Sequence, residues 1–156
     1  MVFLTTLLLV AGVSAQEWST FEPEGHGFSI SMPGEPQEQK VENARMWLSA
    51  KKGEYVYLVA YTDIGDIKPE EEKDLLSETA TANLEGAEAT ETARRTLNWQ
   101  GWNAIECDAS KGDTPYFVRI ISVPEHKRIN ILTTIGEVSD DDMDKFVDSL
   151  EFTEAE

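Results

Sequence analysis

Four aspartates gather near the C-terminal end of the chain, where their carboxylates offer oxygen ligands to a hard cation such as calcium. They are Asp140, Asp141, Asp142 and Asp144. A calcium loop alternates its ligands, turns on a glycine and ends on a bidentate glutamate, whereas Ser139 followed by three acids is typical of a helix start. We therefore expect helix capping and no metal or other cofactor, with calcium binding as the alternative.

Histidine is the usual base in nucleophilic catalysis, and the chain has 2 histidines. His26 stands between two glycines and His126 in a predicted turn, so we expect both to face solvent, away from any recognisable nucleophile motif. With 30 acidic residues, some carboxylate pair falls at any spacing, so such a pair is no signal of hydrolysis. We expect no catalytic residues and no enzyme, and keep a hydrolase with an unrecognised carboxylate site as an alternative.

Two tryptophans and two arginines are the candidate binding residues. Trp99 and Trp102 flank Gln100-Gly101, and a two-residue hairpin would set them opposite one another as a cross-strand pair that stabilises the hairpin. Alternatively, exposed tryptophans at a sheet end would anchor a partner or a sugar ring. Arg94 and Arg95 are expected either to be solvated strand charges or to complement the carboxylates of a partner.

Cys107 is the single cysteine, so no disulfide can form within the chain. It shares its strand parity with Ile105 and Ala109, on the more apolar face of residues 102–110. This pattern favours a small buried hydrophobic side chain. An intermolecular disulfide and a reactive thiol are the alternatives.

Hydrophobic periodicity predicts the elements that position these residues. Three strands are expected before the first helix, over 28–32, 45–51 and 54–62. The third is apolar on both parities, which predicts a central strand covered on both sides. A proline at position 69 opens the first helix, whose buried stripe recurs every four residues until Gly86 ends it. The stripe consists of Leu76, Ala80 and Leu84.

After that helix, the period returns to two over 90–99, 102–110, 114–123 and 128–136, and the short connections predict antiparallel neighbours. The last helix carries Met143, Phe146, Val147 and Leu150 on one face. The sequence thus predicts an α+β fold, in which an antiparallel sheet of six to seven strands, in the order βββ-α-ββββ-α, packs with two helices.

The charge of the chain is strongly negative, at −17, and unevenly distributed. Acidic residues dominate 63–91 and 137–156, whereas 92–136 is more balanced. Such a field repels nucleic acid and anionic lipid, and it attracts cations and basic partners. Nucleic-acid binding is therefore excluded.

The first 15 residues have the character of an export signal. They carry no charge, contain the apolar stretch 2–10 and close on Val13-Ser14-Ala15, with small residues where signal peptidase reads. The apolar stretch is too short to span a bilayer, and no cysteine follows it for lipid attachment. We expect cleavage after Ala15, a single domain over 16–156, a periplasmic or extracellular location and no stable membrane insertion.

The stretch Gly27-Phe28-Ser29-Ile30-Ser31-Met32-Pro33-Gly34-Glu35-Pro36 resembles the opening element of the PsbP/DcrB-like secreted domains. The terminal Phe146-Val147-Asp148-Ser149-Leu150-Glu151-Phe152 resembles the final helix and exit strand of the same family. The resemblance covers roughly 18–153 and consists of structural signatures. It implies an accessory or binding protein on the far side of a membrane, as for a photosystem extrinsic subunit and bacterial envelope proteins of that family. No functional residue is carried over.

Export, the family resemblance and the missing catalytic constellation together favour a non-catalytic binding or accessory domain of the bacterial envelope. Its partner is expected to be an envelope protein or polymer, and the domain itself a monomer or weak oligomer. The more balanced sheet around Trp99 and Trp102 is the expected binding region.

Overall fold

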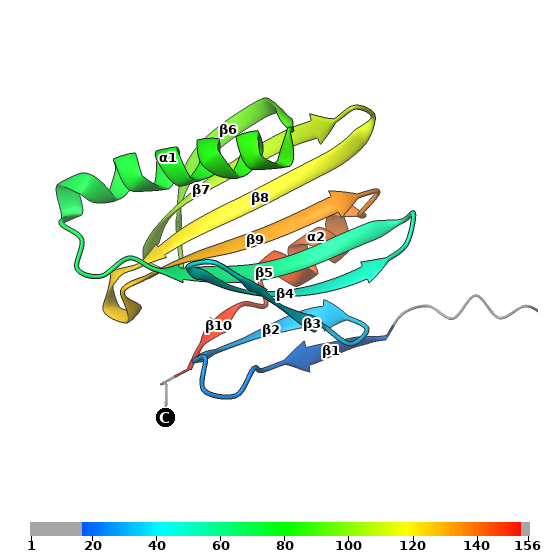
Figure 1. Ribbon diagram of the computed structural model, residues 1–156, viewed down its shortest axis with the longest axis horizontal. Coiled ribbons are helices and arrows are strands. Elements are labelled where there is room, and N and C mark those ends of the chain that lie inside the picture. The colour runs from blue at the N-terminus through cyan, green and yellow to red at the C-terminus, as the bar shows by residue number, and fades with distance from the viewer. Residues whose placement is uncertain (1–16, 154–156) are drawn as a thin grey trace, which may run out of the picture.

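The computed structural model describes residues 17–153 (Figure 1). The predicted signal peptide lies outside these residues. The strands are β1 (Trp18–Phe21), β2 (Phe28–Pro33), β3 (Gln37–Val41), β4 (Ala44–Lys51), β5 (Tyr55–Asp63), β6 (Thr90–Trp99), β7 (Trp102–Lys111), β8 (Thr114–Val123), β9 (Arg128–Gly136) and β10 (Glu151–Phe152). The helices are α1 (Pro69–Ala87), the 3-10 turn η1 (Pro124–His126) and α2 (Asp140–Val147).

The strands form two antiparallel sheets. Seven lie in the order β3-β4-β5-β9-β8-β7-β6, and three in the order β1-β2-β10. The α+β class and the seven-stranded sheet agree with the prediction. The predicted order βββ-α-ββββ-α is wrong in detail, because five strands precede α1, one follows α2, and β1, β2 and β10 leave the large sheet. Period-two hydrophobicity missed β3 because all its residues are exposed, and missed β1 and β10 because they have only 4 and 2 residues.

Helix α1 covers one face of the large sheet, over β6, β7 and β8 (Figure 1). Its predicted stripe is confirmed, since Leu76, Ala80 and Leu84 are buried against the sheet. Gly86 does not end the helix, which continues to Ala87; Glu88, with a φ of 55°, closes it in the left-handed conformation. That cap satisfies the last carbonyls through the Glu88 and Ala89 amides.

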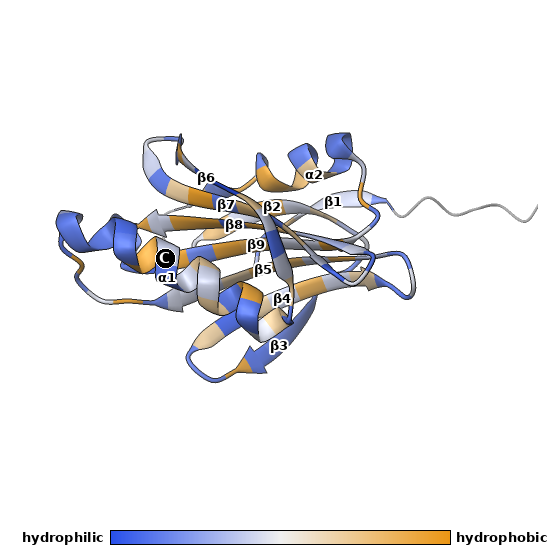
Figure 2. Cartoon of the chain, turned by 90° about the horizontal axis from the view of Figure 1, so that it is seen from above, coloured by the Kyte–Doolittle hydropathy of each residue, from blue (hydrophilic) through white to orange (hydrophobic). Residues whose placement is uncertain are grey.

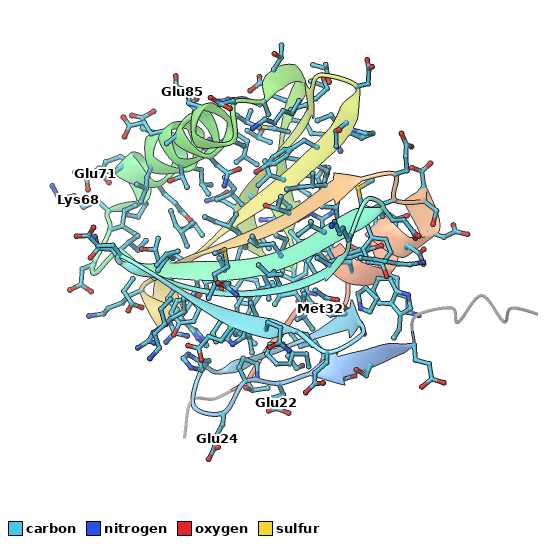
Figure 3. The ribbon with its side chains drawn as sticks, turned by 45° about the vertical axis from the view of Figure 1, so that its right-hand side comes forward. Glu22, Glu24, Met32, Lys68, Glu71 and Glu85 are labelled. Atoms are coloured by element: carbon cyan, nitrogen blue, oxygen red, sulfur yellow. The ribbon has the colours of Figure 1, made fainter. Side chains whose placement is uncertain are left out.

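The small sheet and α2 cover the opposite face of the large sheet (Figure 2). Phe28, Ile30 and Met32 of β2 are buried there, and Met32 points into the core between the sheets (Figure 3). The expected strand over 28–32 is confirmed, but its other face is not open to solvent, because Ser29 is buried as well. From α2, Phe146 packs on Tyr57 with ring centroids 5.2 Å apart. The molecule is thus built from three layers, with α1 and α2 on opposite sides of the large sheet.

Acidic side chains lie on the outside of these layers. Glu22, Glu24, Glu71 and Glu85 project away from the core in Figure 3. Neither helix of the described part has the length and apolar character needed to cross a membrane.

Candidate functional site

The predicted tryptophan pair is confirmed. Trp99 and Trp102 stand opposite one another in the β6–β7 register, with ring centroids 6.1 Å apart and planes 29° from parallel. Trp99 is 7% exposed and belongs to the core beneath the small sheet. Trp102 is partly exposed, donates from Nε1 to Glu125 over 3.0 Å, and packs on Phe152 of β10. The pair therefore closes one end of the core, and only the Trp102 ring offers surface to a partner.

The two predicted binding arginines point to opposite faces of the sheet, and each is engaged by acceptors of its own chain. Arg94 contacts Glu91 over 3.0 Å from Nε, and donates to Ser77 Oγ and Thr81 Oγ1 of α1 over 3.2 and 3.1 Å. Arg95 donates from Nη1 to Asp108 over 2.8 Å. Arg94 therefore ties α1 to the sheet edge, whereas the Arg95 side chain remains half exposed beside Asp108.

Glu106 is a buried carboxylate between two arginines. Its side chain is 6% exposed and accepts from Arg95 on one oxygen and from Arg119 Nε, at 2.7 Å, on the other. Arg119 also donates from Nη1 to Asp148, just after α2, over 3.0 Å. Because every member has a partner of opposite charge, this cluster holds α2 against the sheet and has no free acid or base for catalysis.

The four C-terminal aspartates begin helix α2, as predicted. Ser139 is the N-cap, and its Oγ accepts from the Asp142 amide over 3.2 Å. Three of the aspartates lie in the first helical turn, where they complement the positive end of the helix dipole. Within 17–153, no group of three or more His, Cys, Asp or Glu side chains is placed to hold a metal ion.

The two histidines do not face solvent as predicted. His26 is half-buried between the sheets, shares a 2.6 Å hydrogen bond with the Tyr61 hydroxyl, and lies edge-on to Trp47. His126 is partly buried beside Phe152, with ring centroids 5.5 Å apart. The glycines on both sides of His26 predicted an exposed loop. The loop between β1 and β2 instead folds back onto the large sheet.

Cys107 is fully buried beneath α1 with Ile105 and Ala109, which confirms the predicted small hydrophobic role. Burial raises the pKa of its thiol, and the neighbouring Arg94 lowers that pKa in part. The thiol is therefore kept in the unreactive, protonated form.

The largest unexpected feature is an apolar strip on the α1 side of the large sheet, which we call the open apolar face. It consists of Met46 and Leu48 of β4, Val56 and Leu58 of β5, and Ile131 and Ile135 of β9, all partly exposed. Register places it on that side: Leu58 stands opposite Thr133, which stands opposite Val118 in the core beneath α1. In Figure 1, β4 and β5 lie clear of α1.

Two hollows lie on the molecule, one between α1 and the loop before it and one that includes residues of the open apolar face. One, of about 380 Å³, is lined by apolar and acidic side chains: Ile64, Asp66, Ile67, Glu71, Asp74, Leu75 and Glu78. The other, of about 350 Å³, has Val56 and Ile135 in its wall beside Asp113 and Glu137. Asp74 and Glu78 form no ion pair with any residue of 17–153, so α1 gives an acidic rim on the same side of the sheet as the open apolar face.

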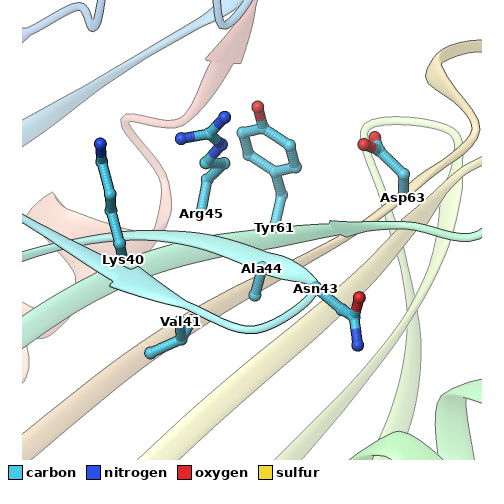
Figure 4. A pocket seen from close by; sticks show the side chains of 7 residues that line it. All are labelled: Lys40, Val41, Asn43, Ala44, Arg45, Tyr61 and Asp63. Atoms are coloured by element: carbon cyan, nitrogen blue, oxygen red, sulfur yellow. The ribbon is translucent and has the colours of Figure 1, made fainter.

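A third hollow lies at the β3–β4 turn (Figure 4). We call it the basic hollow. Its volume is about 480 Å³, and it is lined by Lys40, Val41, Asn43, Ala44, Arg45, Tyr61 and Asp63. Lys40, Arg45 and Tyr61 form one row across β3, β4 and β5, since each stands opposite the next in the register. Figure 4 shows these three side chains rising from the same face of the sheet.

Solved structures share this arrangement of layers. The solution structure of cyanobacterial PsbP (CyanoP) from Synechocystis sp. PCC 6803 matches with a TM-score of 0.62 and 9% sequence identity, over 90% of this chain and 95% of that chain. The chain has a PsbP-like fold. The crystal structure of the Saccharomyces cerevisiae Ran-binding protein Mog1p matches with a TM-score of 0.51 and 10% identity, over 88% of this chain and 96% of that one. No protein-family model matches the chain, and no curated protein does.

The PsbP-like fold confirms the resemblance predicted from residues 27–36 and 146–152, at the level of the fold. Sequence reasoning missed both surfaces described above. The signal for the open apolar face was present, because β5 is apolar on both parities. We expected both its faces to be covered; α1 instead packs on β6–β8 and leaves the outer face of β5 partly exposed. The signal for the basic hollow was too weak, because Lys40, Arg45 and Tyr61 come together only through strand pairing.

Proposed function

We propose that this protein is a non-catalytic accessory domain, exported to the bacterial envelope, that binds a partner protein on its open apolar face. The carrying observation is the apolar side chains of β4, β5 and β9 that point outward and stay partly exposed beside α1. An antiparallel sheet with a solvent-facing side ordinarily turns polar residues outward on that side. A contiguous apolar surface of this kind is typical of a protein interaction site.

Charge indicates the chemistry of that partner. Helix α1 lies on the same side of the sheet as the open apolar face and carries Asp74 and Glu78, which lack ion-pair partners in the described part of the chain. Across an interface, opposite charges steer association and disfavour wrong partners. We therefore expect the partner to present apolar side chains flanked by lysine or arginine.

The fold likeness supports an accessory or binding role over catalysis. Mog1p, whose structure resembles this chain, is a Ran-binding protein. The buried charged cluster around Glu106 is fully paired, and His26 lies against Tyr61 and Trp47, with no serine, threonine or cysteine of residues 17–153 bonded to it. These observations favour the proposal of a non-enzymatic domain, and the charge-free leader 1–15 supports its export.

Site-specific photocrosslinking tests the binding surface. A benzophenone side chain placed at Leu48 or Leu58, in the native envelope, is expected to give a covalent adduct of one discrete mass. The same probe at Thr20, exposed on β1 in the opposite layer, is the matched control and is expected to give none. Equal adducts at all three positions, or none at Leu48 and Leu58, would contradict the proposal.

Charge reversal on the rim tests the partner's chemistry. Asp74→Lys with Glu78→Lys is expected to reduce the Leu58 adduct several-fold. The matched control is Glu22→Lys with Glu24→Lys, which makes the same change in charge in the loop between β1 and β2, away from α1. This control is expected to leave the yield of the Leu58 adduct unchanged. A reduction of the same size in both double variants would show that only net charge matters, and would reject the acidic rim.

Export is tested separately, by N-terminal sequencing of the protein recovered from the envelope fraction. The expected first residue is Gln16. A chain that begins at Met1 would contradict export through a cleaved signal.

A further inference from the structure

We propose that the basic hollow binds a small oxyanion, a phosphate or carboxylate group, held by Lys40 and Arg45. This site lies on the opposite side of the sheet from the open apolar face and does not depend on the proposed partner binding. Lys40, Arg45 and Tyr61 stand in one cross-strand row, so an ammonium, a guanidinium and a hydroxyl line the same hollow of about 480 Å³. The ammonium and the guanidinium donate hydrogen bonds to an oxyanion, whereas the Tyr61 hydroxyl is bonded to His26 and forms part of the wall.

Arg45 differs from the other four arginines in what its guanidinium contacts. Each of the others, Arg94, Arg95, Arg119 and Arg128, donates to at least two acceptors of its own chain. Arg45 has a single ion-pair contact, from Nη1 to Glu38 over 3.6 Å, between side chains that are 49% and 41% exposed. A long, exposed pair of this kind contributes little free energy. The guanidinium fork of Arg45 is therefore available to a ligand.

Lys40 adds an unpaired charge beside that fork. Within 17–153, the Lys40 side chain forms no ion pair or hydrogen bond, although the chain carries a charge of −17. Lys52, Lys73 and Lys145 of the same residues also lack an ion pair, so Lys40 is distinguished by its place directly opposite Arg45 in the cross-strand row. The hollow thus sets two positive charges side by side, while its Asp63 carboxylate is paired with Arg128.

The wall of the hollow is held rigidly by groups that do not need to move. The Tyr61 hydroxyl shares its 2.6 Å hydrogen bond with His26 Nδ1, and the Arg128 guanidinium lies 4.0 Å from the centre of the Tyr61 ring. Arg128 also donates to the His26 carbonyl over 2.6 Å and to Asp63 over 3.2 Å. A fixed wall reduces the entropy lost when a ligand binds.

His26 supplies a reporter beside the site. Burial lowers the pKa of its ring, Arg45 and Arg128 lower it further, and Glu38 raises it in part. Asp63 faces the same region from β5, through its pair with Arg128. An anion bound to Arg45 would offset the positive charge near the ring and so raise the pKa of His26.

The experiment is an NMR pH titration of the two histidine rings in the 16–156 protein, with inorganic phosphate or succinate as the probe and chloride at matched ionic strength as the reference. The expected result is a saturable upward shift of the His26 pKa with the probe, larger than any shift of His126, whose ring packs on Phe152 and not on Tyr61. Phosphate and succinate are compared to decide which oxyanion the hollow prefers.

Variants assign the effect to the hollow. Lys40→Gln and Arg45→Gln are expected to weaken the saturation at least tenfold each, whereas Lys52→Gln, at an exposed lysine in the β4–β5 turn, leaves it unchanged. Arg45→Gln raises the His26 pKa without ligand, so the measured quantity is the change that the probe adds. A His26 shift no larger than in chloride, or one that survives Arg45→Gln, would overturn the site.

Discussion

Glu106 shows how individual charges are used inside this molecule. Its buried carboxylate accepts from Arg119 on one oxygen and from Arg95 on the other, and Arg119 continues to Asp148 beside α2. A buried charge costs several kcal/mol unless it is paired and hydrogen-bonded. Removing one residue of the cluster therefore leaves a buried charge without its partner and destabilises the fold. The cluster fixes α2 on the sheet and leaves no acid in it free to act on a substrate.

Glu106→Gln is therefore expected to lower the free energy of unfolding by about 3 kcal/mol, because Arg119 keeps its burial and loses its main partner. Asp148→Asn removes the exposed end of the same chain of contacts, at a side chain that is 62% exposed, and is expected to cost less than about 1 kcal/mol. Urea unfolding monitored by tryptophan fluorescence measures both. Equal losses in the two variants would mean that Glu106 is not the centre of the cluster.

The ring of His26 makes stability depend on pH. Its pKa in the folded protein lies below the usual value of about 6.5, chiefly because of burial and then because of Arg45 and Arg128. The unfolded chain thus binds the proton more readily, and the neutral ring's contribution to stability is lost as the pH falls from about 6.5 through the folded-state pKa. His26→Asn should therefore lose less stability than the wild type between about pH 7.5 and pH 5.5.

The urea midpoint of each protein is measured at several pH values across that range. The carboxylates titrate alike in both proteins, so the difference between the two slopes of midpoint against pH is due to His26. Parallel slopes would refute the role assigned to its ring.

At the residue scale, the sequence predicted side chains whose surroundings are set by their neighbours along the chain. The Trp99–Trp102 pair followed from a two-residue hairpin, and the burial of Cys107 followed from strand parity. The partners of Arg94 did not follow, because Ser77 and Thr81 lie on α1 and approach only when the helix packs on the sheet edge. A long-range partner leaves no local pattern.

At the scale of elements, two positions occupied by glycine differ in whether they tolerate a larger side chain. Gly136 ends β9 with a φ of 101°, and a Cβ there would collide with the backbone carbonyl oxygen of Glu54. Gly86 lies inside α1, has no atom within 4 Å of an added Cβ, and does not have a positive φ. The first glycine is required by the close approach of two strands, and the second only adds flexibility to the unfolded chain.

Gly86→Ala is accordingly expected to raise the free energy of unfolding by about 0.5–1 kcal/mol, through helix propensity and reduced unfolded-state entropy. Gly136→Ala is expected to destabilise by more than that amount, because the backbone of the β5–β9 pair must shift. Thermal melts of the two single variants test the pair. Stabilisation by Gly136→Ala would show that the strands can move apart at no cost.

Elements with strong hydrophobic periodicity or clear helix caps, such as β2, α1 and α2, could be predicted from the sequence. The way these elements pack on segments far along the chain could not be predicted as well. The β5 sequence predicted burial on both faces, yet packing decides which strands a 19-residue helix covers, and α1 reaches β6–β8. The separation of β1 and β2 into a second sheet likewise depends on tertiary packing, and both candidate surfaces arise from such placement.

For the molecule as a whole, the charge of −17 opposes compaction, because like charges repel across the surface. Raising NaCl from about 0.01 M to about 0.1 M shortens the screening length from about 30 Å to about 10 Å. The melting temperature is therefore expected to rise with salt over this range, by several degrees. Scanning calorimetry at fixed pH measures the shift, and a melting temperature that falls with salt would mean that ion pairs outweigh repulsion.

The position of Cys107 gives the folded chain a built-in reporter of opening. The thiol lies on β7 beneath α1 at 0% exposure, so a labelling reagent or another chain's thiol reaches it only when the helix leaves the sheet. In an oxidising compartment, covalent dimers of this protein would therefore count opening events and not native encounters. The rate of their appearance would measure how often α1 leaves the sheet.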